Sequence, residues 1–186
     1  MALTRLGPNQ LINLATNTTG SLNLTSQVTG TLPVANGGTA LTSGFNNGKF
    51  GQIQIAEREN EVDIYSSSYS LITGLSKTIT PTATSSKVLI LANLNGVGKH
   101  SGADRGGFRI TRAGTELKVF SQSVADNNST STNFFGSADT IVYLDSPNST
   151  SSLEYEVTGK RFNASGALRV NSNNGYSSLT LIEILA

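Results

Sequence analysis

Segment 96–101 contains the glycines and the lysine of a phosphate-binding loop, but not at the spacing that such a loop needs. A phosphate-binding loop has a glycine five residues before its Gly-Lys pair and a hydroxyl directly after the lysine. Asn93 and His100 occupy those positions here, so we expect a loop between two strands. His100 is the only histidine, which excludes a two-histidine metal site within one chain. Two interpretations of His100 stay open: an exposed loop residue, or one of three ligands around a threefold axis.

The densest group of carboxylates is the run Glu57-Arg58-Glu59-Asn60-Glu61-Val62-Asp63. A pair of acids across a groove hydrolyses glycosides, whereas charges at the edge of a sheet discourage unwanted strand pairing. We favour the edge interpretation, because the chain is small and has no tryptophan to line a sugar groove. The sequence also has no cysteine and no Gly-x-Ser-x-Gly nucleophile elbow. We therefore expect no enzymatic activity, no catalytic residues, no metal and no cofactor.

Four segments rich in Asn, Ser and Gly, at 96–106, 125–133, 159–166 and 171–177, carry isolated basic and aromatic side chains. Amides and hydroxyls exchange hydrogen bonds with sugar hydroxyls, and a flat ring stacks on a sugar. These segments are candidates for contact with host-surface glycans, and solvated turns without a ligand are the alternative. The candidate receptor-facing residues are Lys99, His100, Arg105, Asn127, Asn128, Arg161, Phe162, Asn173 and Tyr176.

Such loops need strands to hold them, and the sequence from Phe50 onward has the pattern of short strands. Apolar and polar residues alternate in short runs, and turn signals such as Asn95-Gly96 and Ala113-Gly114 separate the runs. No run shows the periodicity of a helix. We therefore expect an all-β head, an antiparallel β-sandwich or jelly roll. The expected strands are 50–56, 62–65, 71–75, 87–94, 107–112, 115–121, 134–145, 153–158, 167–171 and 178–185.

The segment before the head, residues 6–48, contains no charged residue. Paired aliphatic residues recur in it about every ten positions, at i and i+2, which is one face of an extended strand. A disordered linker is one interpretation of this composition. The other is an extended neck in which several chains meet along a common axis, because paired aliphatics cannot be buried by one chain alone. The expected trimer-neck residues are Ile12, Leu14, Leu22, Leu24, Leu32 and Val34.

The run Val28-Thr29-Gly30-Thr31-Leu32-Pro33-Val34-Ala35-Asn36-Gly37-Gly38-Thr39 resembles a motif in tail-fibre and other virion proteins of tailed bacteriophages. In that family the motif precedes a distal β-rich domain, and the next residue is commonly Gly where this chain has Ala40. Several segments of the head are similar to small phage virion domains. They are 85–90, 107–110, 144–150 and 178–184.

The resemblance implies a homotrimeric phage fibre or decoration protein, assembled in the host cytoplasm and exposed on the virion surface. We expect residues 1–15 to dock on other virion proteins, residues 16–48 to form the extended neck, and residues 49–186 to form the head. Host-surface attachment by a tail fibre is the leading function. Capsid decoration or a head fibre is the alternative, and a small glycan-degrading enzyme is the remote one.

Charge and hydropathy limit the partners of the chain. Lys and Arg total 13 against 12 Asp and Glu, a formal net charge of +1. This balance lacks the basic footprint of a nucleic-acid-binding protein. The longest apolar runs, such as Val88 to Ala92, are far shorter than the ~20 residues that cross a bilayer. We therefore expect neither nucleic-acid binding nor membrane insertion.

Overall fold

Alternating residues build an all-β head, as the sequence predicts. The computed structural model describes residues 49–100, 104–127, 137–163 and 166–185, and within these ranges every regular element is a strand. The expected docking segment, the neck with its six aliphatic residues, and Asn128 lie outside the described residues. The same holds for the side chain of Asn127.

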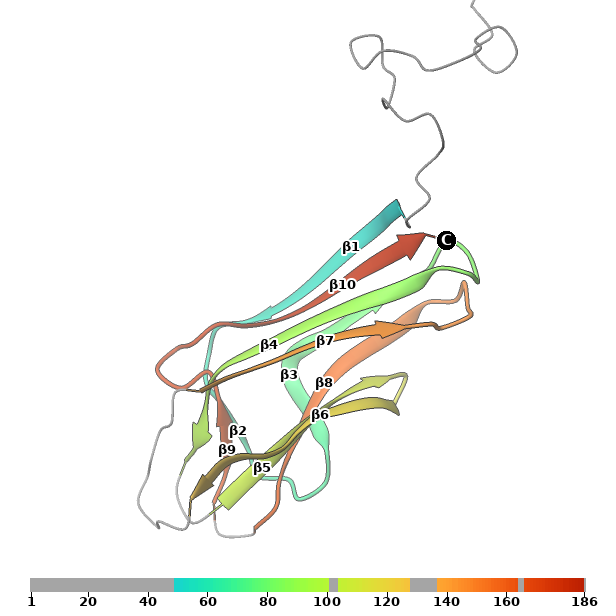
Figure 1. The fold of residues 1–186 in the computed structure, drawn as a ribbon. Helices are drawn as coiled ribbons and strands as arrows, with labels where there is room; N and C mark the ends of the chain where they lie inside the picture. Colours follow the sequence, from blue (N-terminus) through green and yellow to red (C-terminus); the bar gives the residue numbers. More distant parts are fainter. Residues whose placement is uncertain (1–48, 101–103, 128–136, 164–165, 186) are drawn as a thin grey trace, which may run out of the picture. The chain divides into compact units, whose positions relative to one another are not determined.

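Ten strands form the head (Figure 1). They are β1 Lys49–Arg58, β2 Val62–Ile64, β3 Ser70–Ile79, β4 Lys87–Lys99, β5 Asp104–Arg112, β6 Thr115–Asn127, β7 Ser137–Asp145, β8 Leu153–Arg161, β9 Leu168–Val170 and β10 Ser177–Leu185.

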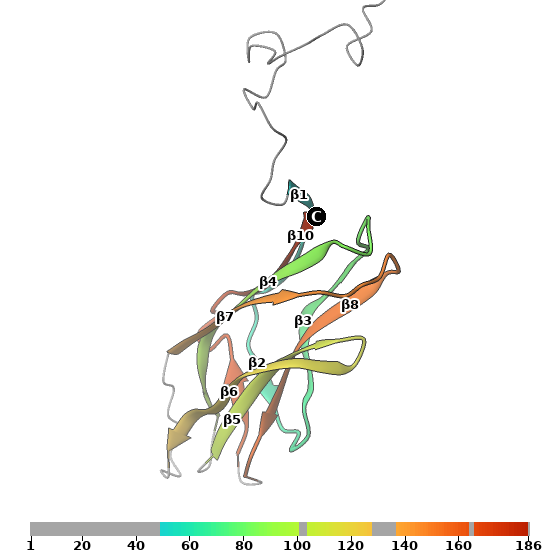
Figure 2. The ribbon, with the colours of Figure 1, turned by 45° about the vertical axis from the view of Figure 1, so that its right-hand side comes forward.

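The strands pair antiparallel in two sheets that face each other as layers (Figure 2). The long strands of one sheet follow the order β1-β10-β4-β7, and the other sheet follows β3-β8-β5-β6. Successive long strands mostly alternate between the sheets, and the first and last strands pair, which is jelly-roll connectivity. The short strands β2 and β9 pair with each other, and β9 extends the first sheet along the end of β4. The predicted fold class, an antiparallel jelly-roll sandwich, is confirmed for the head.

The core lies between the two sheets because every second side chain of each strand points inward. In β4 the residues Val88, Ile90, Ala92 and Leu94 are buried, while their neighbours in between are partly or fully exposed. The ring of Phe108 in β5 stacks on Phe120 in β6 with centroids 6.0 Å apart. Further core side chains come from the remaining strands: Ile72, Leu75, Ile79, Ile110, Tyr155, Val157, Leu179 and Leu181.

A polar contact joins the two sheets across this core. Asp145 ends β7 in the first sheet, and its Oδ2 accepts hydrogen bonds from Arg112 of β5 and Tyr155 of β8 in the second sheet. The Tyr155 hydroxyl lies 2.7 Å from that oxygen. Burial, together with the bond to Asp145, raises the pKa of Tyr155 above its usual range. The phenol therefore stays protonated and keeps donating, so the contact tethers one layer to the other.

Two predicted turns have different outcomes. Ala113 and Gly114 connect β5 to β6 with positive φ angles of 48° and 77°, the pattern of a two-residue hairpin turn, as predicted. Asn95-Gly96 is not a turn, since β4 runs through it to Lys99. The pairing of β4 shifts register between Leu94 and Val97, so the Asn-Gly pair forms an irregularity within a strand.

Candidate interaction surfaces

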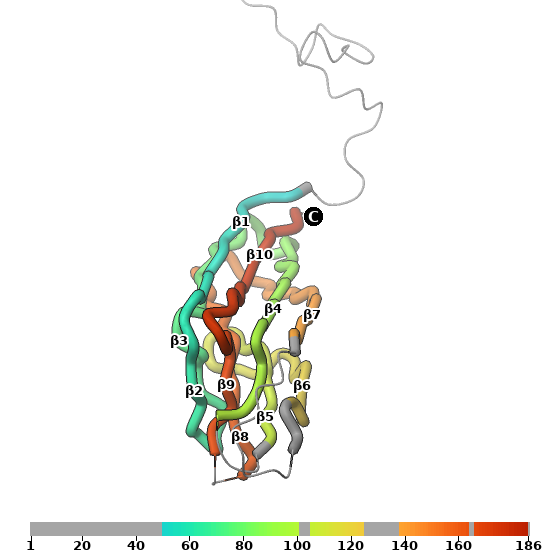
Figure 3. Tube along the Cα trace, turned by 90° about the vertical axis from the view of Figure 1, so that its left-hand side faces the viewer, coloured from blue at the N-terminus to red at the C-terminus, as the bar shows by residue number. Residues whose placement is uncertain are grey.

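The outer face of the β1-β10-β4-β7 sheet is apolar. Figure 3 views the head from the side on which these four strands lie next to one another. Strand pairing aligns their outward side chains in rows that cross the sheet. The first row is Ile53, Ile182, Leu89 and Leu144, and the second is Ile55, Thr180, Leu91 and Val142. Seven of these eight residues are aliphatic, so this face has the composition of a core.

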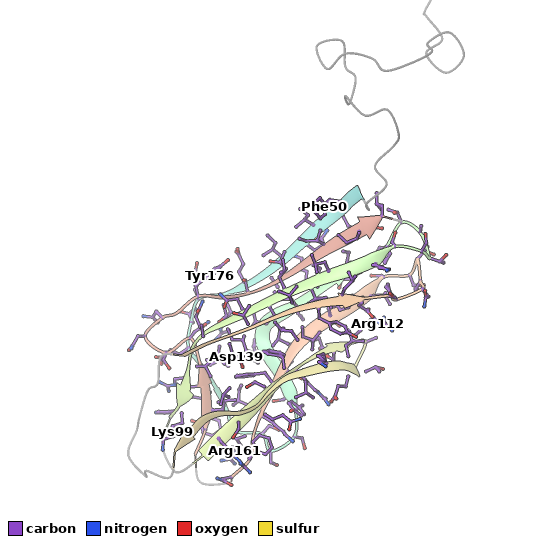
Figure 4. All side chains as sticks on the ribbon, in the orientation of Figure 1. Phe50, Lys99, Arg112, Asp139, Arg161 and Tyr176 are labelled. Carbon is purple, nitrogen blue, oxygen red and sulfur yellow. The ribbon has the colours of Figure 1, made fainter. Side chains whose placement is uncertain are left out.

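Several side chains of these rows are exposed to solvent. Val142 is 64% exposed, Ile53 56%, Leu144 48% and Ile55 46%, and Phe50 beside the rows is 70% exposed. Exposed fractions of this size leave roughly 100 Å² on each side chain, on the order of 500 Å² together. This is the size of the largest apolar patch on a typical monomer, and such patches are often interaction sites. Figure 4 shows Phe50 on β1 at one end of the head.

Charged groups stand only at the ends of this face. The next row is polar and contains Glu57, Ser178, Asn93 and Thr140, with a 2.9 Å hydrogen bond from Thr140 to Asn93. Lys87 lies at the opposite end, in register with Ile184. A face with an apolar centre and a polar rim is the arrangement found in protein–protein interfaces.

The second surface is a cation–aromatic cluster on the outer face of the other sheet. It consists of Tyr69, Arg105, Arg109, Lys160 and Phe162. Strands β5 and β8 pair in unbroken register, with Gly107 opposite Lys160 and Arg109 opposite Thr158. Residues 105, 107 and 109 therefore share one face of β5, and residues 158 and 160 share that face of β8. Phe162 follows directly after β8. The backbone N–H of Phe162 also donates to the carbonyl of Arg105 at 2.9 Å.

Cations and rings alternate in this cluster. The Lys160 ammonium lies 4.7 Å from the centroid of the Tyr69 ring and 4.6 Å from that of Phe162. The Arg105 guanidinium lies 5.2 Å from the Phe162 centroid, and that of Arg109 lies 4.3 Å from the Tyr69 centroid. All four distances fall within the range of cation–π attraction. The cluster is therefore a chain of contacts that holds three cationic groups in place.

Tyr69 reaches this position because Gly107 has no side chain. A Cβ at Gly107 would lie 3.2 Å from the Tyr69 hydroxyl and 2.8 Å from the carbonyl oxygen of Ser121. Partial burial raises the pKa of Tyr69, although the Arg109 charge acts in the opposite direction. The phenol is therefore a hydrogen-bond donor at neutral pH. Arg109 also donates to Thr158 at 3.2 Å and pairs with Glu116 at 2.9 Å.

The structure brings two of the predicted receptor-facing residues together in this cluster, namely Arg105 and Phe162. Tyr69, Arg109 and Lys160 are not among the predicted receptor-facing residues. A signal was present for Arg109, which alternates with the apolar residues Phe108 and Ile110. Tyr69 has no such local signal, because its contacts depend on how β3, β8 and β5 pair.

The prediction of an exposed loop is wrong for Lys99. Lys99 is fully buried at the end of β4, and the connection to β5 spans only residues 100–103. Pairing of Gly98 and Lys99 with β9 accounts for the difference, because it extends the strand past the glycines that look like a loop in the sequence. Figure 4 places Lys99 and Arg161 near the same end of the head.

His100 belongs to a charged group around Arg169. Arg169 donates to both oxygens of Asp63 at 2.6 and 2.8 Å and contacts Glu61 at 2.9 Å. The His100 Nδ1 atom lies 2.8 Å from Asp63 Oδ2. The bond from Arg169 lowers the pKa of Asp63 despite its partial burial. The acidic run is thus at an edge strand, as predicted, but Glu61 and Asp63 are paired with Arg169 as well as solvated.

The remaining predicted residues are separate from the cation–aromatic cluster. The backbone N–H of Asn173 donates to Glu61 at 2.8 Å, so Asn173 lies beside the charged group around Arg169. The hydroxyl of Tyr176 donates to Glu57 at 2.6 Å, near the polar row of the apolar face. Arg161 donates to the carbonyl of Gly166 and ties the connection after β8 to that strand. The nine predicted residues therefore do not form one site.

The described part of the chain contains no cluster of three or more His, Cys, Asp or Glu side chains suited to a metal. It also contains no helix long and apolar enough to span a bilayer.

No family model matches the sequence, and no curated protein matches it. Solved structures with a similar arrangement include the infectious bursal disease virus VP2 subviral particle, at 12% identity and a TM-score of 0.41, covering 83% of this chain and 37% of that chain. Dimeric latent PorU from Porphyromonas gingivalis matches at 12% identity and a TM-score of 0.41, covering 80% of this chain and 14% of that chain.

A family 35 carbohydrate binding module from Clostridium thermocellum matches at 15% identity and a TM-score of 0.31, covering 69% of this chain and 98% of that one. The chain spans well under half the length of the first two proteins. Identities of 12–15% and TM-scores below 0.5 carry no function over to this chain.

Proposed function

We propose that the chain is the subunit of a bacteriophage fibre, a homotrimer whose jelly-roll heads attach the virion to the host surface. The observation that carries this proposal is the apolar outer face of the β1-β10-β4-β7 sheet. We assign this face to contacts with further copies of the same chain. The resemblance of residues 28–39 to the fibre motif supports the phage assignment independently.

The exposed area fits such a contact. About 500 Å² of exposed apolar area, at an apolar share of about 65% for oligomer interfaces, corresponds to roughly 800 Å² per subunit. That is the size of a standard stable interface. Burying 500 Å² at about 25 cal/mol per Å² gives on the order of 12 kcal/mol per subunit before the entropy of association. The face therefore offers an apolar burial energy on the scale of a protein–protein interface.

Chain continuity also favours copies of the same chain. Strand β1, which carries Phe50, Ile53 and Ile55, begins directly after residues 1–48. The aliphatic pairs of that segment are likewise expected to meet further copies of the chain. Three copies of the apolar face then surround one axis, which closes the assembly and leaves the opposite sheet facing outward.

In this proposal the fibre binds and performs no chemistry. The last two acids of the run from 57 to 63, Glu61 and Asp63, are paired with Arg169 rather than facing each other across a groove. Incubation with host capsular polysaccharide tests this point. A loss of polysaccharide molecular weight would make the chain an enzyme.

The native mass of the full chain tests the assembly. We expect about three times the 19.4 kDa chain mass by sedimentation equilibrium at micromolar concentration. Val142→Lys should weaken the oligomer about 100-fold or more, because each lysine is forced out of water at the interface. Leu71→Lys is the matched control, since Leu71 is 41% exposed on β3 in the other sheet. A monomer at all concentrations, or equal effects of the two variants, would refute the proposal.

The place on the particle needs a separate measurement. Gold-labelled antibodies against the head should mark the tail in electron micrographs of virions. Label on capsid faces or vertices would reassign the chain to head decoration, and the trimer proposal would stand.

A further inference from the structure

We propose that the cation–aromatic cluster binds the carboxylate groups of an acidic saccharide. This inference deepens the host-attachment function and rests on it for its biological meaning. The binding itself is a property of the head and can be measured without a virion.

Lys160 is the centre of the cluster. Its ammonium lies between the rings of Tyr69 and Phe162, at 4.7 and 4.6 Å from their centroids. Within the described residues no carboxylate or carbonyl accepts a hydrogen bond from it. Ring faces hold a cation without using its N–H groups, so the three donors of Lys160 stay available. An ammonium that is fixed but not neutralised attracts an anion.

Two guanidinium groups flank this ammonium. The guanidinium of Arg105 lies over the ring of Phe162, and that of Arg109 lies over the ring of Tyr69. A planar guanidinium binds a carboxylate through two parallel N–H bonds, and stacking fixes the plane before the ligand arrives. Glu116 balances part of the Arg109 charge, but it is 47% exposed. A ligand carboxylate can therefore bind beside Arg109 without removing a buried partner.

The groups between the cations are suited to sugar hydroxyls. The phenol of Tyr69 donates a hydrogen bond, and Phe162 is 37% exposed at the rim of the cluster. The hydroxyl of Thr158 is buried and accepts a bond from Arg109, so it holds that guanidinium in place. Charged anchors with a phenol and an exposed ring between them match a saccharide that carries both carboxylates and hydroxyls.

The cluster is too small and too mixed in charge for a nucleic-acid backbone. A backbone needs an extended run of cations, because each contact neutralises one phosphate. Here the cations are three, and Glu116 and Glu156 lie on the same face of the sheet. The net charge of the whole chain is only +1. These observations favour an acidic saccharide over DNA or RNA.

Strand pairing positions the cationic residues of the cluster. Arg105, Arg109 and Lys160 are strand residues, and the pairing of β5 with β8 sets their separations. Tyr69 directly precedes β3, whose residue Ser70 pairs with Gly159 of β8. The protein therefore loses less conformational entropy when a ligand binds, which strengthens the binding.

The test is calorimetric titration of the full chain with tetragalacturonate, and with maltotetraose as the neutral saccharide of the same length. We expect tetragalacturonate to bind, with affinity that falls as salt is raised, and maltotetraose to bind at least tenfold more weakly. Equal binding of the two, or binding of neither, would overturn the inference. Tighter binding of a phosphate-bearing thymidine tetranucleotide than of tetragalacturonate would also overturn it, in favour of nucleic acid.

Variants place the ligand on the cluster. Lys160→Met keeps most of the aliphatic stem and removes the charge, and we expect at least a tenfold loss of affinity for tetragalacturonate. Lys118→Met is the matched control, because Lys118 is an exposed lysine on β6 of the same sheet, and its effect should stay within twofold. Phe162→Leu leaves every charge in place but removes one ring, so it should weaken binding three- to tenfold. Equal losses for Lys160→Met and Lys118→Met would contradict the site.

Folding and assembly are controlled in the same samples. The thermal midpoint of each variant should lie within ~3 °C of the parent, and its native mass should be unchanged. If the native mass shows a monomer while tetragalacturonate still binds, the fibre proposal fails and the saccharide site stands. If a trimer forms and no tetragalacturonate binds, the saccharide site fails and the fibre proposal stands.

Discussion

Glu183 is an example of a single residue whose role depends on its surroundings. It lies near the end of β10 and is fully buried. Its Oε1 accepts bonds from the backbone N–H of Thr82 at 2.6 Å and from the Thr82 hydroxyl at 2.8 Å, and its Oε2 accepts one from Gln52 at 3.2 Å. Burial alone would raise the pKa of Glu183, but these bonds outweigh it and lower the pKa to about 2.

The carboxylate of Glu183 should therefore stabilise the head in a defined pH range. Its folded pKa of about 2 lies below the ordinary value of 4.5, so its contribution is complete above pH 4.5 and is lost as the pH falls towards 2. We expect Glu183→Gln to lower the free energy of unfolding by about 1–3 kcal/mol at pH 7. Urea denaturation at pH 7 and at pH 2.5 measures this, and the difference from the parent should shrink at the lower pH.

The control for this prediction is Glu154→Gln. Glu154 is exposed on β8, so its replacement should change the stability by less than ~0.5 kcal/mol at either pH. A loss of stability for Glu183→Gln that is the same at pH 7 and pH 2.5 would show that side-chain volume, and not charge, is responsible.

At the scale of elements, β4 shows how a strand continues through a turn signal. Gly96 has a φ of 56°, and a Cβ there would lie 2.6 Å from the backbone nitrogen of Ser172. The backbone bonds from Asn171 to Asn95 and from Ser172 to Gly96 hold this irregularity against the segment after β9. Only glycine satisfies both the left-handed φ and the close approach.

A pair of substitutions separates these two requirements. Gly114→Ala in the β5–β6 turn should cost about 1 kcal/mol for its φ of 77° alone, because nothing lies within 4 Å of the added Cβ. In Gly96→Ala the added Cβ has a similar φ cost and also clashes with the backbone. We therefore expect this variant to lose about 3 kcal/mol or more of the free energy of unfolding. Urea denaturation measures both variants. Equal losses would mean that the segment after β9 moves aside without cost.

At the scale of the whole molecule, the two surfaces lie on opposite sheets. The apolar face belongs to the β1-β10-β4-β7 sheet, and the cation–aromatic cluster belongs to the β3-β8-β5-β6 sheet. Self-association through the first sheet therefore leaves the cluster on the second sheet accessible. In the proposed trimeric fibre, three clusters bind one long polymer at the same time, and the binding energies then combine.

This arrangement predicts a difference between short and long ligands. Val142→Lys should leave the affinity for tetragalacturonate within twofold of the parent, since it lies on the other sheet. The affinity of the Val142→Lys variant for polygalacturonate of about a hundred sugar units should fall about 10- to 100-fold, because a monomer binds through one site only. Biolayer interferometry with the immobilised polymer measures the second quantity. An unchanged affinity for the polymer would show that the heads bind independently.

The sequence by itself determined the local features of the head. Alternation in 87–94 and 178–185 predicted strands, and the Ala113-Gly114 pair predicted a hairpin, because side-chain direction and φ preferences act within a few residues. The sequence also shows that the charged residue Arg109 alternates with the apolar residues Phe108 and Ile110. Arg105 and Phe162 were candidates because they are isolated basic and aromatic residues in segments rich in Asn, Ser and Gly, although the contacts of both remained hidden.

Only the tertiary structure decided which of these residues meet. Tyr69 and Lys160 are 91 positions apart, and they come together because β3 and β5 both pair with β8. Ile53, Leu89, Leu144 and Ile182 form one row for the same reason, although each strand alone shows only an ordinary alternation. Lys99 is buried because β4 gains β9 as a partner. Strand pairing over such separations depends on the packing of the whole core, which no local pattern encodes.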